Sequence, residues 1–168
     1  MLNLTVEKAI NEQINAELYS AYLYLSMSAY LETQSLPGFA NWMRIQFQEE
    51  QAHALKFFDY VNERGGKVTL TAIEEPATDW SSVSAVFENT LEHERLVTGK
   101  INHLMDIAME EKDYATESFL RWFIDEQVEE EATAETILSH VERVEGNGNG
   151  LMMLDRELGS RVFTPPTE

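Results

Sequence analysis

Glu50 and His53 are the two residues whose types and spacing point most directly to chemistry. They lie three positions apart in the stretch Glu49-Glu50-Gln51-Ala52-His53, so on a helix both side chains project from one face. The other positions on that face are apolar: Met43, Phe47, Ala54, Phe57 and Val61. A buried carboxylate without a partner is costly, so Glu50 must be protonated, pair with a cation or bind a metal.

The composition limits the ligands that a metal could find. There is no cysteine among the 168 residues, which excludes disulfides and thiolate sites. Oxygen and imidazole ligands favour ions such as iron, manganese, zinc or calcium. The 30 acidic and 12 basic residues give a net charge of -18, which argues against nucleic acid as a partner and suits cations. A soluble acidic protein without bound cations would have the same charge.

The chain carries no recognisable targeting or membrane segment. Its start lacks the basic and apolar regions of a signal peptide, and no window approaches a charge-free apolar run of about 18 residues. We therefore expect no membrane partner and a cytoplasmic location.

Apolar residues recur at helical spacing in four long segments and one short segment. The pattern predicts a single domain over 1–168, with a bundle over about 5–144, a short helix over about 150–159 and a tail over 160–168. Residues 65–82 lack helical spacing. When extended they can reach about 55 Å, more than the roughly 40 Å of the preceding helix. The second and third helices can therefore run parallel, in an all-α four-helix bundle with one long crossover.

Each long helix carries polar residues within its apolar face, near the middle of the bundle. These residues are Glu17, Glu50, His53, Glu94, Gln127 and Glu130. Taken singly, each could be a hydrogen-bonded core residue or a residue on a misassigned face. Together, at a common height and without basic residues on the same faces, they predict bound cations. The excess of oxygen ligands favours iron, and Glu50 could bridge two ions.

This ordered set, with the stretch Glu126–Glu131 and the long crossover, resembles the non-haem ferritins, closest to the bacterial type, over nearly the whole chain. The resemblance implies a ferritin-like fold and a ferroxidase centre that oxidises Fe(II) with O2. It implies that Glu17, Glu50 and His53 hold one iron. It also implies that Glu50, Glu94 and Glu130 hold the second iron, with Gln127 hydrogen-bonding beside them.

The resemblance also implies a third iron position and a nearby redox-active residue. The third position would use Glu49, Glu126, Glu129 and Glu130, although acidic residues on a helix surface are ordinarily just solvated. Tyr24 stands at the position of the family's near-site tyrosine and is a candidate electron donor. Core packing explains Tyr24 equally well, and it explains Trp122 better than a redox role does.

Two departures separate the chain from bacterioferritins. Gln127 and Glu130 stand where a second Glu-x-x-His motif would be, and Ala52 replaces the haem-ligating methionine, so we expect no haem. The family assembles twenty-four copies into a hollow shell that stores Fe(III) mineral, with the short helix at the fourfold axis. The alternatives are a rubrerythrin-like di-iron peroxidase or oxidase, and a non-catalytic acidic bundle that buffers metal or binds partner proteins.

Overall fold

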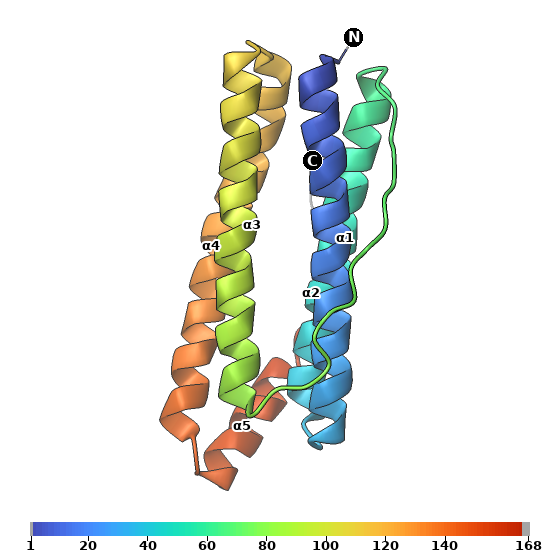
Figure 1. The fold of residues 1–168 in the computed structure, drawn as a ribbon. Coiled ribbons are helices and arrows are strands. Elements are labelled where there is room, and N and C mark those ends of the chain that lie inside the picture. The colour runs from blue at the N-terminus through green and yellow to red at the C-terminus, as the bar shows by residue number, and fades with distance from the viewer. Residues whose placement is uncertain (1, 166–168) are drawn as a thin grey trace.

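The computed structural model describes residues 2–165, and within them the chain forms five α-helices and no β-strand (Figure 1). The helices are α1 (Leu4–Thr33), α2 (Pro37–Glu63), α3 (Val83–Glu110), α4 (Tyr114–Val144) and α5 (Gly148–Leu158). The predicted four-helix bundle with a short fifth helix is confirmed. The short helix begins at Gly148, slightly before the predicted start at about residue 150. The Asn147 side chain accepts a hydrogen bond from the Gly150 amide at 3.2 Å, and this cap starts the helix at Gly148.

Polar side chains also cap three of the four long helices. Asn3 accepts from the Thr5 amide at 2.7 Å at the start of α1, and Ser82 accepts from the Ala85 amide at 3.0 Å at the start of α3. Asp113 begins α4 in the same way. Each oxygen satisfies an amide that has no partner within its own helix.

The crossover between α2 and α3 runs back along α1, so that α2 and α3 are parallel (Figure 1). The exposed face of α1 holds it there. Asn11 donates to the carbonyl of Lys67 at 3.0 Å, Asn15 to that of Ala72 at 3.0 Å, and Ser26 to the carbonyl of residue 77 at 2.6 Å. These bonds satisfy backbone groups that have no regular secondary structure to pair with.

The core consists of two apolar clusters, and the polar residues predicted at mid-bundle belong to neither of them. One cluster includes Met27, Phe39 and Phe87, and the other includes Phe57 and Phe123. The six polar residues predicted at mid-bundle are all buried. Of the five apolar positions predicted beside Glu50 and His53, only Phe47 is partly rather than fully buried. The spacing therefore predicted the buried faces of the four long helices.

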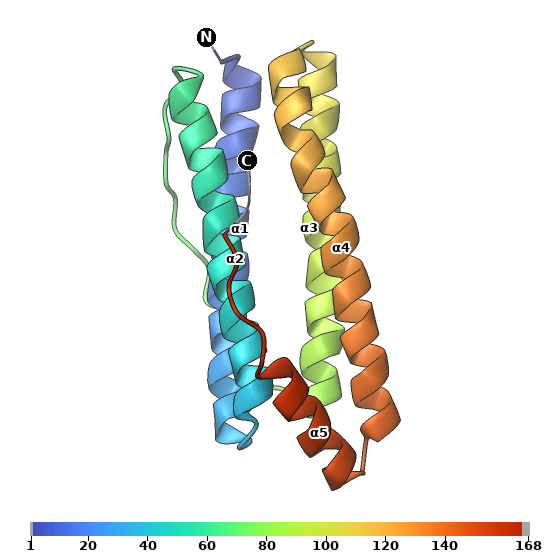
Figure 2. The same cartoon turned by 180° about the vertical axis from the view of Figure 1, so that it is seen from behind.

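Helix α5 crosses the end of the bundle and joins α4 to α2 (Figure 2). The N-terminus of α2 has no side-chain cap of its own. Asp155 of α5 supplies one, because its Oδ1 accepts from the amides of Gly38 at 2.8 Å and Phe39 at 3.0 Å. A Cβ atom at Gly38 would lie 1.6 Å from the Asp155 carbonyl oxygen, so this approach requires glycine.

After α5 the chain turns back along α2 without regular secondary structure up to residue 165 (Figure 2). The predicted tail over 160–168 includes residues 166–168, which lie outside the described residues. Among the helices of residues 2–165, none combines the length and the apolar character that crossing a membrane requires.

Candidate metal centre

Glu17 of α1 and Glu50 and His53 of α2 converge inside the bundle. One potential ligand atom from each residue lies within 4.8 Å of the other two, and all three side chains belong to residues at most 2% exposed. Within the described part of the chain, this is the one group of three His, Cys, Asp or Glu residues spaced so closely. Two carboxylates and an imidazole can together bind a metal ion.

Two carboxylate oxygens in this group lack hydrogen-bond partners. Gln13 Nε2 donates to Glu17 Oε1 at 2.7 Å, but Glu17 Oε2 and Glu50 Oε2 are buried and unpaired. His53 Nδ1 lies 3.6 Å from Glu50 Oε2, beyond the usual length of a hydrogen bond. Buried acceptors without partners are rare, and a bound cation would satisfy both oxygens.

Glu94 of α3 lies on the opposite hairpin and is held by hydrogen bonds. Tyr24 OH donates to Glu94 Oε1, and Gln127 Nε2 donates to Glu94 Oε2 at 3.1 Å. Gln127 also lies 3.3 Å from Thr98 Oγ1, and Thr98 donates to Glu131 Oε1 at 2.5 Å. Gln127 and Tyr24 therefore orient the Glu94 carboxylate from two sides.

Glu130 of α4 has a different donor. Gln46 Nε2 of α2 lies 2.9 Å from Glu130 Oε2, and both residues are buried. The Oε1 atom of Gln46 is itself buried without a partner. Glu50, Glu94 and Glu130 do not form a second group as close as that of Glu17, Glu50 and His53 among the residues described.

Burial raises the pKa of every carboxyl group in the centre. The negative charge of Glu50 raises the pKa of Glu17 further. The charges of Glu94 and Glu130 likewise raise the pKa of Glu50 further. Burial and the charge of Glu94 raise the pKa of Glu130 to about 8. Hydrogen bonds from Tyr24 and Gln127 offset part of the rise at Glu94. Without a cation, these carboxylates are poorly stabilised in their charged forms.

The pKa of Tyr24 is also raised, first by burial and then by the charge of Glu94. The phenol therefore keeps its proton near neutral pH and can donate it to the carboxylate. Its ring belongs to the apolar cluster that contains Met27 and Phe87, so Tyr24 is both a core residue and a hydrogen-bond donor to Glu94.

The residues predicted for a third iron position are not brought together as a close group in the described residues. Glu49 is partly buried and pairs with Arg161, whose Nη2 lies 2.6 Å from Glu49 Oε2. Glu126 is partly buried and Glu129 is exposed. Burial has the largest effect on the pKa of Glu49 and raises it. The charges of Arg161 and His53 oppose this rise, the charge of Glu126 adds to it, and the net shift is upward.

The family described as ferritin-like domain matches residues 7–144. The bacterial non-heme ferritin of Staphylococcus saprophyticus is 44% identical to this chain, and that of Staphylococcus aureus is 41% identical. Each comparison covers 97% of this chain and 98% of the relative. The chain belongs to the ferritin family. A closed form of Archaeoglobus fulgidus ferritin, engineered by site-directed mutagenesis, is 51% identical over 98% of this chain and 100% of its own, with a TM-score of 0.97. The open-pore Archaeoglobus fulgidus ferritin is 50% identical over 96% of this chain and 100% of its own, with a TM-score of 0.95.

Sequence reasoning missed three residues that touch the centre of this ferritin. Gln13 precedes Glu17 by four positions, and Gln46 precedes Glu50 by four. For Gln13 that spacing places the amide one turn from the carboxylate that it binds, so it was a usable signal. Gln46 binds Glu130 on another helix instead, across 84 positions of the chain, so its spacing gave no such signal. Arg161 gave no such signal, because it contacts Glu49 across 112 positions of the chain.

Proposed function

We propose that this ferritin is a ferroxidase, which oxidises Fe(II) with O2 at a di-iron centre and stores the Fe(III) as a mineral. The observation that carries the proposal is the convergence of Glu17, Glu50 and His53, with two buried carboxylate oxygens unpaired. Carboxylate and imidazole ligands suit Fe(II), and a bound cation would offset the cost of burying these charges.

In this proposal Glu17, Glu50 and His53 bind one Fe(II), and Glu50, Glu94 and Glu130 bind the second. Glu50 is the shared ligand. Glu50 lies in the close group with Glu17 and His53. Burial, and then the charges of Glu94 and Glu130, raise its pKa. Gln127 acts through Glu94, to which it donates a hydrogen bond.

The residues of the centre favour oxidation because anionic oxygen ligands stabilise Fe(III) more than Fe(II). Two Fe(II) ions supply two electrons to one O2. Reduction of O2 to water needs two more electrons, of which Tyr24 can supply one and an Fe(II) ion at the third position the other. The proton that the phenol then loses can pass to Glu94, which already accepts its hydrogen bond. We propose a third iron position at Glu49, Glu126, Glu129 and Glu130, from which iron moves on to the mineral.

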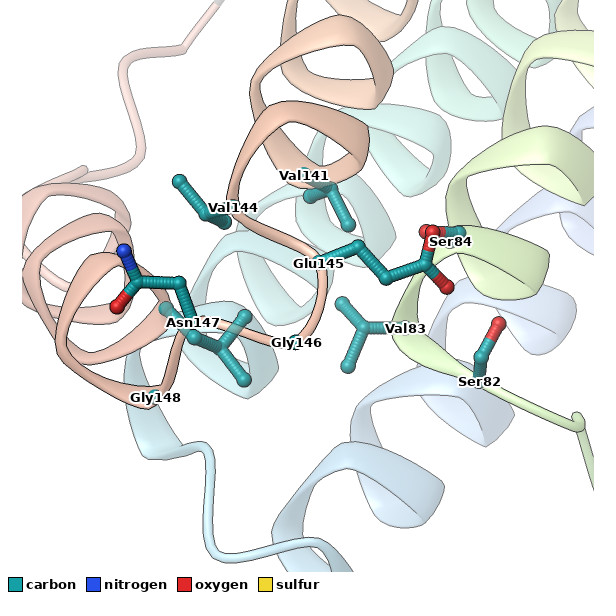
Figure 3. Close-up of a pocket in the computed structure, with 10 residues that line it drawn as sticks. Ser82, Val83, Ser84, Val141, Val144, Glu145, Gly146, Asn147 and Gly148 are labelled. Carbon is teal, nitrogen blue, oxygen red and sulfur yellow. The ribbon is translucent and has the colours of Figure 1, made fainter.

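We also propose that twenty-four copies assemble into a shell with α5 at an interface. A pocket of about 320 Å³ lies where the start of α3 meets the end of α4 and the start of α5 (Figure 3). Val83, Val141 and Val144 give it apolar walls. On α5 itself, Met152 and Met153 are 56% and 72% exposed. Exposed apolar side chains on α5, and an apolar pocket at the start of the same helix, support burial by neighbouring copies.

Aerobic addition of Fe(II) to metal-free protein tests the function. We expect O2 consumption with an amber ferric product, and size-exclusion chromatography should give a large assembly. Metal binding without O2 consumption would instead favour the metal-buffering bundle. Preferential use of peroxide would favour a rubrerythrin-like peroxidase, and a persistent monomer or dimer would contradict the shell.

A further inference from the structure

The segment after α5 places a cation beside the metal centre. This segment runs along α2 (Figure 2), and Asn41 of α2 fixes it by donating from Nδ2 to the Arg161 carbonyl at 3.0 Å. Asp155 anchors the preceding helix to the start of α2 through the Gly38 and Phe39 amides. The backbone at Arg161 is therefore held by contacts that do not involve its own side chain.

The Arg161 side chain is wedged between an aromatic ring and a carboxylate. Its Cζ atom lies 4.6 Å from the centroid of Trp42, and its Nη2 atom lies 2.6 Å from Glu49 Oε2. The side chains of Arg161 and Glu49 are 25% and 19% exposed. A charge-assisted hydrogen bond this short and partly shielded from water is stronger than an ordinary surface ion pair.

One nitrogen of the same guanidinium is unsatisfied. Arg161 Nη1 is buried and has no hydrogen-bond partner, although arginine usually binds carboxylates through two parallel bonds. Glu49 immediately precedes Glu50, the proposed shared iron ligand. In the described residues, Arg161 is the one Lys or Arg side chain that forms an ion pair with a residue of the proposed iron positions.

We propose that Arg161 is an internal counterion that occupies Glu49 until iron displaces it, and that it thereby sets the affinity of the third iron position. This inference rests on the proposed function, to which the third position belongs. A metal ion that binds Glu49 through Oε2 displaces the Arg161 contact, and one that binds through Oε1 competes with the same guanidinium for the carboxylate charge. The displaced guanidinium keeps its stacking partner, Trp42, and its backbone anchor. A position weakened in this way passes iron on to the mineral more readily than it retains it.

Zn²⁺ titration of the assembled, metal-free protein tests the proposal, because Zn²⁺ binds without being oxidised. Arg161→Gln should tighten the third and weakest Zn²⁺ site by about tenfold, an effect equivalent to about 1.4 kcal/mol. The two tighter sites should keep their affinities. Arg161→Lys retains the charge but not the planar stacking group, so it should give a smaller gain, and it also serves if Arg161→Gln fails to assemble.

Two controls separate displacement of a specific contact from a general effect of charge. Arg156→Gln removes the same charge from an exposed position of α5 and should leave all Zn²⁺ affinities unchanged. Glu49→Gln combined with Arg161→Gln should abolish the gain. The proposal is overturned if Arg161→Gln leaves the third site unchanged or without detectable Zn²⁺, or if Arg156→Gln tightens it equally.

The same variants distinguish this inference from the proposed function. Stopped-flow Fe(II) oxidation of the first two irons per subunit should proceed at the wild-type rate in Arg161→Gln. If that oxidation is intact but the third Zn²⁺ affinity does not change, the counterion role of Arg161 is wrong and the ferroxidase proposal stands. Absence of Fe(II) oxidation in the wild-type protein would instead contradict the proposed function itself.

Discussion

Gln46 Nε2 donates to Glu130 Oε2 at 2.9 Å, and this buried contact joins α2 of one hairpin to α4 of the other. Gln46 cannot itself carry charge, yet it fixes one of the proposed ligands of the second iron. Its own Oε1 atom has no partner, so the amide also presents an acceptor beside the centre.

Gln46→Ala should weaken binding at the second iron position, because the Glu130 carboxylate loses the donor that orients it. Residues that orient metal ligands typically contribute about 10- to 100-fold in affinity or activity, and we expect an effect in that range on the rate of Fe(II) oxidation. Stopped-flow absorbance measures it. Gln48→Ala, at an exposed position of α2, is the matched control, and equal rates in both variants would exclude the role of Gln46.

Glu50→Ala should abolish rapid oxidation, since it removes the proposed ligand shared by both iron positions. Glu129→Ala should leave the first turnover intact and alter later turnovers, because Glu129 is exposed and belongs only to the proposed third position. Oxidation kinetics at two and at higher Fe(II) ratios per subunit measure the difference. The site assignment is wrong if both variants oxidise the first two irons at the wild-type rate.

The metal-free protein should lose stability as the pH rises through the titration of Glu130. Burial and the Glu94 charge raise the folded-state pKa of Glu130 to about 8, against an ordinary value of 4.5. A group whose pKa is higher in the folded state than in the unfolded state makes its full contribution to stability below the unfolded-state pKa. For Glu130 this contribution is lost as the pH rises from about 4.5 to about 8. Glu130→Gln should therefore stabilise the metal-free protein at pH 8.5, by up to about 5 kcal/mol, and have little effect near pH 4.5.

Chemical denaturation at the two pH values measures this effect. Saturating Zn²⁺ should reverse the order of stability at pH 8.5, because the wild-type carboxylate then has a cation to bind. An identical pH dependence in the wild-type and Glu130→Gln proteins would show that Glu130 titrates normally.

His93 should make the protein less stable as the pH falls, the opposite of the effect expected for Glu130. Burial, and then the positive charge of Lys100, lower its pKa from 6.5 to about 4, and its Nε2 atom lies 2.8 Å from Ser20 Oγ. A histidine held neutral in the folded state loses its stabilising contribution as the pH falls from about 6.5 to 4, by up to about 3 kcal/mol. His93→Gln should reduce this loss. His140→Gln, at an exposed position, should not, and titration by NMR measures the His93 pKa directly.

Tyr24→Phe should preserve metal binding and remove one source of electrons. The substitution deletes the hydroxyl that donates to Glu94 but keeps the buried ring. We expect Zn²⁺ affinity within about a factor of ten of wild type, since only one of the donors to Glu94 is lost. A tyrosyl radical should appear by EPR after Fe(II) oxidation in the wild type only. If the same radical appears in Tyr24→Phe, the radical belongs to another residue.

Much of the bundle could be predicted from the sequence because periodicity carries the relevant physics. Glu17, Glu50 and Glu94 interrupt apolar faces at matching heights, and the structure buries all three. The early start of α5 was missed because it depends on the Asn147 cap, in a stretch whose glycines indicate a turn. The contact between Arg161 and Glu49 depends on how the last segment folds back over α2. Helical spacing contains no information about such a contact.

The group of Glu17, Glu50 and His53 comes entirely from the α1–α2 hairpin, whereas Glu94, Gln127 and Glu130 come from the α3–α4 hairpin. The first proposed iron position is therefore complete within one half of the chain. The second needs both halves, so the ion that occupies it would act as a cross-link between the hairpins. Under this assignment, occupation of the second position would hold the two hairpins together.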